Sequence, residues 1–199
     1  MGHQAEQIQA ALGDGAHLGV HITYSAEQGS LLGTGGALKL AERWFAPRAL
    51  VLNGDTYFAL DYARFVRFHD GERRRDQSVV ASLSLGRADD CRQCGSVELD
   101  RSGCRVVAFR EKDAHATPKW LNGGACVIEN DLLRDVPVGQ PCSLEREVFP
   151  RALARGQRLA AWISRRRFFD IGTPESLERF RSYYLKSSCN QPCSSTATA

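Results

Sequence analysis

One short run, Ala49-Leu50-Val51-Leu52-Asn53-Gly54-Asp55-Thr56, indicates an α/β fold for this chain. Its four consecutive apolar residues predict a strand buried on both faces, as found in the middle of a parallel sheet. Asn53 and Gly54 tolerate turn geometry, so the chain is expected to leave the sheet there and to place Asp55 just beyond the strand. Open α/β sheets bind ligands just beyond the carboxyl ends of their strands. Asn53, Gly54 and Asp55 also suit a plain surface turn, however.

Strand and helix patterns alternate upstream of this run. Residues 20–24 alternate as a strand, and the glycines of residues 33–36 open a helix over residues 37–45 that ends before Pro47. Together with the apolar run, these segments indicate a right-handed βαβ unit whose two strands are parallel.

Further along the chain, strands accumulate without helices between them. Residues 95–99 and 105–111 form a predicted hairpin, so the parallel core is expected to give way to an antiparallel portion. Asp61 and Ser143 are predicted N-caps, and Pro150 should interrupt the helix that Ser143 begins. The other predicted strands cover residues 78–85, 125–128, 159–163 and 168–169, and the predicted helices cover residues 5–12, 61–70, 143–154 and 174–185.

The composition is that of an ordinary globular chain. Its 199 residues, 43% of them apolar, can bury a sizeable core. We expect a single domain over residues 1–186 and a disordered tail over residues 187–199. No apolar run is long enough to span a membrane and no signal-peptide core is present, so a cytoplasmic location is expected. A net charge of +3 does not indicate nucleic-acid binding, even with arginine clusters at residues 73–75 and 165–167.

The seven cysteines indicate free thiols rather than a disulfide framework, because their number is odd and their spacing is irregular. Cys91 and Cys94 have the spacing of half a zinc site, but no second paired motif follows, so unmetallated loop cysteines are favoured. Cys126 lies in an apolar strand and is expected in the core.

Two carboxylates stand out, because Asp55 and Asp170 each come directly after a predicted strand. If both strands belong to one sheet and run the same way, the two acids meet at the same edge. Two acids from different strands can hold Mg²⁺, which keeps several waters and takes further oxygens from substrate phosphates.

Three other segments could bind a substrate, and each also has a simpler interpretation. Residues 33–36 fit neither the dinucleotide fingerprint nor the P-loop, but their glycines could approach a nucleobase or an anion, or could only give a flexible helix entry. Glu111 and Lys112 could bind sugar hydroxyls and a phosphate, or form an exposed ion pair. Residues 122–124 offer an amide and exposed backbone to a sugar, or make a turn.

In order and content, these segments resemble the sugar-phosphate nucleotidyltransferases. The resemblance is closest to the D-glycero-D-manno-heptose 1-phosphate guanylyltransferases, followed by the mannose-1-phosphate guanylyltransferases. It covers residues 2–184 and rests on seven motifs in the same order, namely LGTGGA (32–37), VLNGDT (51–56), GSV (95–97), FREK (109–112), LNGG (121–124), SLE (143–145) and FDIGTPE (169–175).

The resemblance implies a Rossmann-like, three-layer, GT-A-like fold with a mixed and mainly parallel central sheet. It also implies that a sugar 1-phosphate attacks the α-phosphorus of GTP and gives a GDP-sugar and pyrophosphate; a homo-oligomer is compatible with it. Asp55, Asp170 and Lys112 would be catalytic, with both aspartates binding Mg²⁺ and Lys112 lying near the sugar phosphate. The nucleobase would be held by Gly33, Thr34, Gly35 and Gly36, and the sugar by Asn53, Gly95, Glu111, Asn122 and Gly123.

Three elements of that family are missing from the sequence. Its members open with a strand and a glycine-rich loop ending in Gly-Thr-Arg, followed by a Pro-Lys segment, and these hold the triphosphate. We therefore expect an N-terminally truncated domain with an uncovered inner sheet edge and little or no transferase activity on its own. The alternative is a non-catalytic subunit that binds sugar nucleotides or regulates an active partner.

Overall fold

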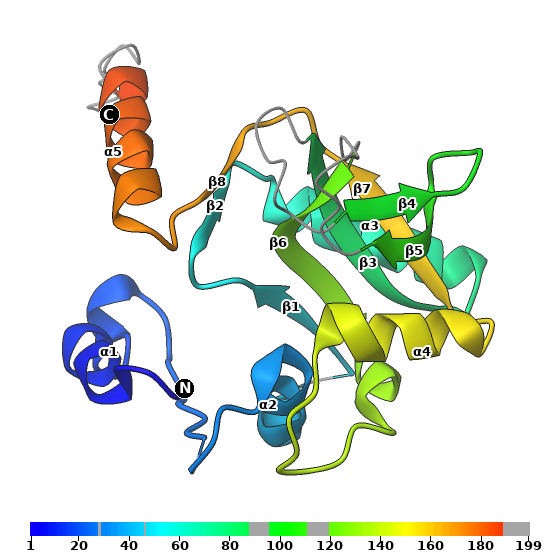
Figure 1. Ribbon diagram of the computed structural model, residues 1–199, viewed down its shortest axis with the longest axis horizontal. Coiled ribbons are helices and arrows are strands. Elements are labelled where there is room, and N and C mark those ends of the chain that lie inside the picture. Colours follow the sequence, from blue (N-terminus) through cyan, green and yellow to red (C-terminus); the bar gives the residue numbers. More distant parts are fainter. Residues whose placement is uncertain (28, 46, 88–95, 111–119, 189–199) are drawn as a thin grey trace, which may run out of the picture.

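The computed structural model describes residues 1–27, 29–45, 47–87, 96–110 and 120–188. Its main element is a six-stranded sheet with the strand order β1-β6-β3-β7-β5-β4 (Figure 1). β3 and β7 pair in parallel, whereas the other neighbouring strands of this sheet pair antiparallel. The strands are β1 (Arg48–Leu52), β3 (Val79–Arg87), β4 (Ser96–Leu99), β5 (Arg105–Arg110), β6 (Trp120–Glu129) and β7 (Arg158–Ile163).

The expectation of a mainly parallel sheet is wrong, although the sheet is mixed as predicted. β1, β3 and β7 run in the same direction, but β6 lies between β1 and β3 and runs the opposite way. The predicted antiparallel hairpin of β4 and β5 is confirmed. The position of β6 was not predictable, because pairing between distant strands leaves no periodic pattern in the sequence.

β1 lies at the edge of the sheet, so its predicted place in the buried middle is wrong. Ala49 and Val51 pack against the core, whereas Leu50 and Leu52 are 38% and 50% exposed. The strand buried on both faces is β3, in which every residue except Arg87 is buried. An apolar run shows that a strand can be buried, but its neighbours in the sheet decide whether it is.

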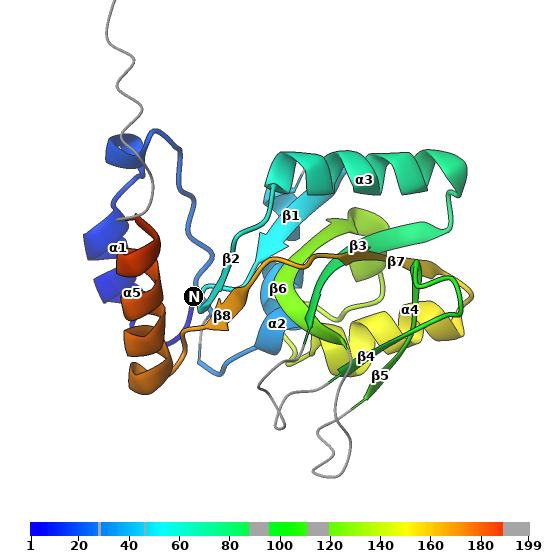
Figure 2. The same ribbon diagram turned by 90° about the horizontal axis from the view of Figure 1, so that it is seen from above.

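Helices cover both faces of the main sheet, as a three-layer α/β fold requires (Figure 2). On one face, α3 (Tyr62–Arg75) packs Phe65 against Ala125 of β6. The next residue of β6, Cys126, belongs to the larger core on the other face, which includes residues of α4 (Phe149–Ala154). The three-layer architecture and the buried position of Cys126 are confirmed.

The predicted helices are present, but the helix predicted over residues 37–45 begins at Gly33, and the helix predicted over residues 61–70 continues to Arg75. α1 (Ala5–Leu12) matches its prediction, and the 143–154 helix is divided near Pro150 into η4 (Leu144–Val148) and α4. Asp61 and Ser143 cap α3 and η4 by accepting hydrogen bonds from the backbone amides three residues later, at 2.8 and 3.2 Å. The remaining helical segments are η1 (Ala16–Leu18), α2 (Gly33–Ala41), η2 (Glu42–Trp44), η3 (Asn130–Leu133) and α5 (Pro174–Ser188).

The strand predicted over residues 20–24 is not formed, so the βαβ unit that depended on it is also wrong. Among the described strands none pairs with this segment. The amides of Val20 and Ile22 instead donate to the carbonyls of Gly15 and Asp14, at 3.2 and 2.8 Å. Alternation predicts a strand, but a strand persists only where a neighbour completes its hydrogen-bond ladder.

A second sheet of two strands stands beside the main one. β2 (Thr56–Phe58) and β8 (Phe168–Asp170) pair antiparallel, and α5 follows β8 and lies next to this ribbon (Figure 1). α5 runs to Ser188, two residues into the predicted tail, and residues 189–199 lie outside the described part of the chain.

Three smaller expectations can be compared with the structure. Within the described ranges, no helix is both long and apolar enough to cross a membrane.

Cys104, Cys126 and Cys142 are free thiols, as predicted, whereas Cys91 and Cys94 lie outside the described residues. In the first arginine cluster, Arg73 donates to the carbonyl of Val79 at 3.0 Å, so it serves the fold.

Leu83→Ala should strongly destabilise the protein, because Leu83 is fully buried in β3 and truncation leaves a cavity. We expect the free energy of unfolding, measured by urea denaturation, to fall by about 2–5 kcal/mol. Val107→Ala is the control, because Val107 is 49% exposed on β5. Its cost should stay below about 0.5 kcal/mol, and equal losses in both variants would contradict a central position for β3.

Candidate active site

The two aspartates singled out in the sequence lie together beside Gly172. A Cβ atom built on this glycine would stand 3.1 Å from Asp170 Oδ1 and 3.4 Å from Asp55 Oδ2, so both carboxylates border one small space. The amide of Ile171 donates to the backbone carbonyl of Asp55 at 2.8 Å, and Thr56 is the ladder partner of Asp170. Backbone hydrogen bonds therefore hold the two acids side by side.

The acids meet by a different route from the one predicted. The sequence suggested two strands of a single sheet, but β1, which precedes Asp55, belongs to the main sheet, and β8 belongs to the ribbon. Asp170 is the last residue of β8 rather than the residue after it. The pairing of β2 with β8 brings the carboxylates together, and β2 was not among the predicted strands.

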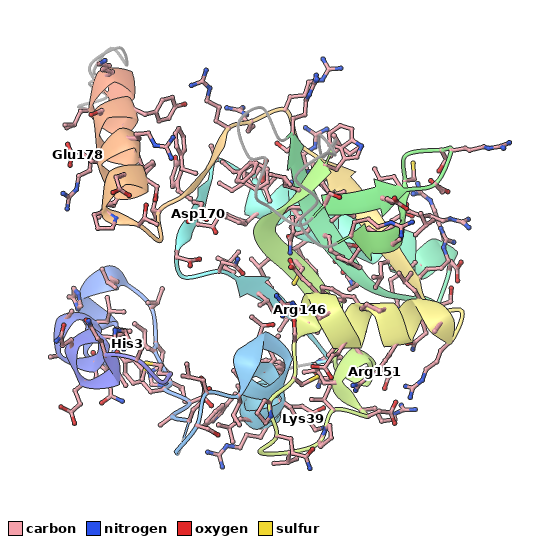
Figure 3. All side chains as sticks on the ribbon, viewed as in Figure 1. His3, Lys39, Arg146, Arg151, Asp170 and Glu178 are labelled. Atoms are coloured by element: carbon pink, nitrogen blue, oxygen red, sulfur yellow. The ribbon has the colours of Figure 1, made fainter. Side chains whose placement is uncertain are left out.

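The two carboxylates fit a hard divalent cation. Their hydrogen bonds within the described residues come from neutral donors, the amide of Gly172 at 2.9 Å and the hydroxyl of Thr56 at 3.5 Å. Both side chains are exposed, and Asp170 lies where β8 leads into α5 (Figure 3). In the described ranges no group of three or more His, Cys, Asp or Glu side chains is placed to hold a metal ion, so at this site the described residues would supply two carboxylates. Mg²⁺ commonly takes one or two carboxylates and completes its shell with water and phosphate.

The glycine-rich start of α2 has two parts with different surroundings. The amides of Gly35 and Gly36 donate to the carbonyl of Cys142, at 2.8 and 3.1 Å, and both glycines are buried. Gly33 and Thr34 are exposed, and the Thr34 hydroxyl accepts from the amide of Leu144 at 2.9 Å. The exposed pair is therefore the part of this segment that could meet a nucleobase.

Close packing explains the glycine at position 36. A Cβ atom there would stand 2.5 Å from the carbonyl oxygen of Gln140 and 3.0 Å from Cβ of Leu32. The absence of a side chain lets the 140–142 segment lie directly against α2. Packing alone therefore requires a glycine at position 36.

The predicted sugar-binding side of the site contains Asn122 and a residue that the site prediction left out, Glu145. The Asn122 amide donates to Glu145 Oε1 at 2.6 Å, and its oxygen accepts from the amide of Gly124 at 3.2 Å. Asn53 lies on the same side, because its backbone amide donates to the backbone carbonyl of Gly124 at 2.8 Å. Gly123 is buried against the ring of Phe58.

The negative charge of Glu145 affects the pKa of a buried thiol, that of Cys126. Burial and, to a smaller extent, the nearby carboxylate of Glu145 together raise the pKa of the Cys126 thiol to about 12. The Ser-Leu-Glu motif at residues 143–145 was a signal for Glu145, but only the contact with Asn122 gives it a place in the site. The predicted site residues Gly95, Glu111 and Lys112 lie outside the described part of the chain.

A mixed sheet covered by helices, with two neighbouring acids and a glycine-rich helix start, defines an α/β protein. Residues 1–187 match the family described as Nucleotidyl transferase, and the chain belongs to this family. The predicted Rossmann-like nucleotidyltransferase fold is thereby confirmed.

Two proteins with similar sequences are guanylyltransferases. The mannose-1-phosphate guanylyltransferase of Mycobacterium tuberculosis is 35% identical over 173 residues, which are 86% of this chain and 46% of that protein. A D-glycero-alpha-D-manno-heptose 1-phosphate guanylyltransferase of Campylobacter jejuni is 31% identical, with 82% and 67% covered. The chain thus spans about half the length of the first relative.

Solved structures of similar fold include further nucleotidyltransferases. The crystal structure of HddC from Yersinia pseudotuberculosis complexed with GMP-PN has a TM-score of 0.75 at 25% identity, covering 92% of this chain and 76% of that chain. A putative glucose-1-phosphate thymidylyltransferase from Bacillus anthracis, with a TM-score of 0.73 at 22% identity, shares the fold.

Gly36→Ala should destabilise the protein, because the added methyl group would collide with the 140–142 segment. We expect a loss of about 1–3 kcal/mol in the free energy of unfolding. Gly71→Ala is the matched control, since Gly71 lies within α3 and a Cβ atom there would meet nothing within 4 Å. The Gly71→Ala variant should gain about 0.5–1 kcal/mol in the free energy of unfolding from helix propensity. Thermal unfolding should therefore show a lower unfolding temperature for Gly36→Ala and a higher one for Gly71→Ala, and a change in the same direction for both would contradict the packing explanation.

Proposed function

We propose that this chain is a sugar-1-phosphate guanylyltransferase, which joins GTP and a sugar 1-phosphate into a GDP-sugar and releases pyrophosphate. The observation that carries the proposal is the pair of exposed carboxylates, Asp55 and Asp170, that lie beside Gly172. Family membership supports the reaction type, and the names of the two relatives support GTP with mannose 1-phosphate or D-glycero-D-manno-heptose 1-phosphate.

In this proposal, Asp55 and Asp170 hold Mg²⁺. When bound there, the ion supplies positive charge that lowers the repulsion between the triphosphate and the sugar phosphate. The protein's own contribution is to align the attacking oxygen of the sugar phosphate with the α-phosphorus of GTP and the leaving pyrophosphate. No covalent intermediate on a side chain is needed. Gly33 and Thr34 hold the nucleobase in this assignment, while Lys112 lies near the sugar phosphate.

Asn122 and Glu145 would orient the sugar. Their mutual hydrogen bond fixes the amide, while the second carboxylate oxygen of Glu145 and the remaining amide hydrogen can still meet hydroxyl groups. Asn53, Gly123, Gly95 and Glu111 belong to the same proposed subsite. Polar groups set in a fixed arrangement discriminate between sugars that differ in one hydroxyl.

Pyrophosphate release tests the proposal directly. The chain is mixed with Mg²⁺, GTP and either mannose 1-phosphate or heptose 1-phosphate, and the release is followed by a coupled assay. Magnesium-dependent turnover establishes the enzyme, identifies its sugar and contradicts the expectation that this chain has little or no transferase activity on its own. Binding of GDP-mannose or GDP-heptose without turnover would instead favour the non-catalytic sugar-nucleotide-binding subunit. No binding at millimolar concentration would contradict both.

Asp55→Asn and Asp170→Asn should each weaken binding of Mn²⁺, used as a spectroscopic substitute for Mg²⁺, by about tenfold or more, because each removes one of two charged ligands. Electron paramagnetic resonance measures the free ion. Asp61→Asn is the control, because asparagine can also cap α3 and this side chain accepts from the amide of Arg64. Unchanged Mn²⁺ affinity in both test variants would rule out the proposed metal site.

A further inference from the structure

The ribbon that carries the two acids is too small to hold its own shape. β2 and β8 contain three residues each and form a sheet separate from the main one. An isolated pair of strands is at best marginally stable in water. The backbone hydrogen bonds that hold Asp55 and Asp170 side by side therefore need support from contacts outside the ribbon.

One face of the ribbon rests on the main sheet. Phe58 and Phe168 are opposite each other in the ladder, and their ring centroids are 5.8 Å apart. Cβ atoms built on Gly123 of β6 and Gly86 of β3 would come within 2.4 and 2.5 Å of these rings. Because side chains alternate along a strand, the next pair faces away from the main sheet.

The pair on the other face is Tyr57 and Phe169, and both rings contact Phe180 of α5. The ring centroid of Phe180 lies 4.7 Å from that of Tyr57 and 5.5 Å from that of Phe169. Along the chain, Tyr57 comes two residues after Asp55, and Phe169 directly precedes Asp170. A single ring on α5 thus touches a close sequence neighbour of each acid.

We propose that Phe180 is a positioning residue for the acid pair. By packing on Tyr57 and Phe169 it fixes the separation of the Asp55 and Asp170 carboxylates, and with it their affinity for a divalent cation. This inference rests on the proposed function, which assigns the cation to these two acids. A metal site needs its ligands held to within about 0.5 Å, and a ribbon of this size cannot supply that rigidity alone.

Phe180→Leu in the full chain tests this role, with Mn²⁺ affinity measured by electron paramagnetic resonance at a temperature where circular dichroism shows the protein folded. We expect Mn²⁺ binding to weaken about tenfold or more, the range found when groups that support metal ligands are lost. Phe180→Tyr keeps the ring and should retain the affinity of the unchanged protein. Phe180→Met, which conserves volume without a ring, replaces the leucine variant if that variant does not fold.

Phe109→Leu separates positioning from general destabilisation. Phe109 stacks on Phe149 with ring centroids 5.4 Å apart, in the core of the main sheet. Its loss should lower the unfolding temperature while leaving Mn²⁺ affinity of the folded protein unchanged.

The possible results separate this inference from the proposed function. Unchanged Mn²⁺ affinity in the leucine or methionine variant of Phe180, or an equal loss of affinity in Phe109→Leu, would overturn the positioning role alone. No Mn²⁺ binding by the unsubstituted chain would overturn the metal assignment and the positioning role together.

Discussion

The antiparallel pairing of β2 with β8 is the constraint on which the candidate site depends. It places Thr56 opposite Asp170, and the amide of Ile171 donates to the carbonyl of Asp55. Both carboxylates are exposed, so water weakens the repulsion between their like charges. A divalent cation between them would relieve that repulsion. The same geometry therefore favours cation binding.

Glycines make the close approaches around this ribbon possible. A side chain at Gly172 would crowd both carboxylates, and Gly123 lets the ring of Phe58 rest on the main sheet. Gly36 has a different task, because it admits the 140–142 segment against α2. Glycines that look alike in the sequence therefore divide into those that border the candidate site and those that only permit packing. Contacts in the folded chain separate the two groups.

Packing connects the proposed nucleotide and sugar sides of the site. The carbonyl of Cys142 accepts from the buried start of α2, and Leu144 donates to Thr34. The next residue, Glu145, accepts from Asn122 on β6. One short segment thus contacts both the helix start assigned to the nucleobase and the strand assigned to the sugar. A shift of this segment would change both subsites, which couples their geometries.

The sequence by itself determined the local elements and the family. Periodicity and cap residues located α1, α3, β3 and the β4–β5 hairpin, and the ordered motifs indicated a nucleotidyltransferase, because each of these signals lies within a few neighbouring residues. Only the tertiary structure decided that β1 is an edge strand, that residues 20–24 form no strand, and that Asp55 reaches Asp170 through β2. It also decided that Glu145 meets Asn122. These outcomes depend on which distant segments pair, and hydrogen bonds between distant segments leave no local pattern in a sequence.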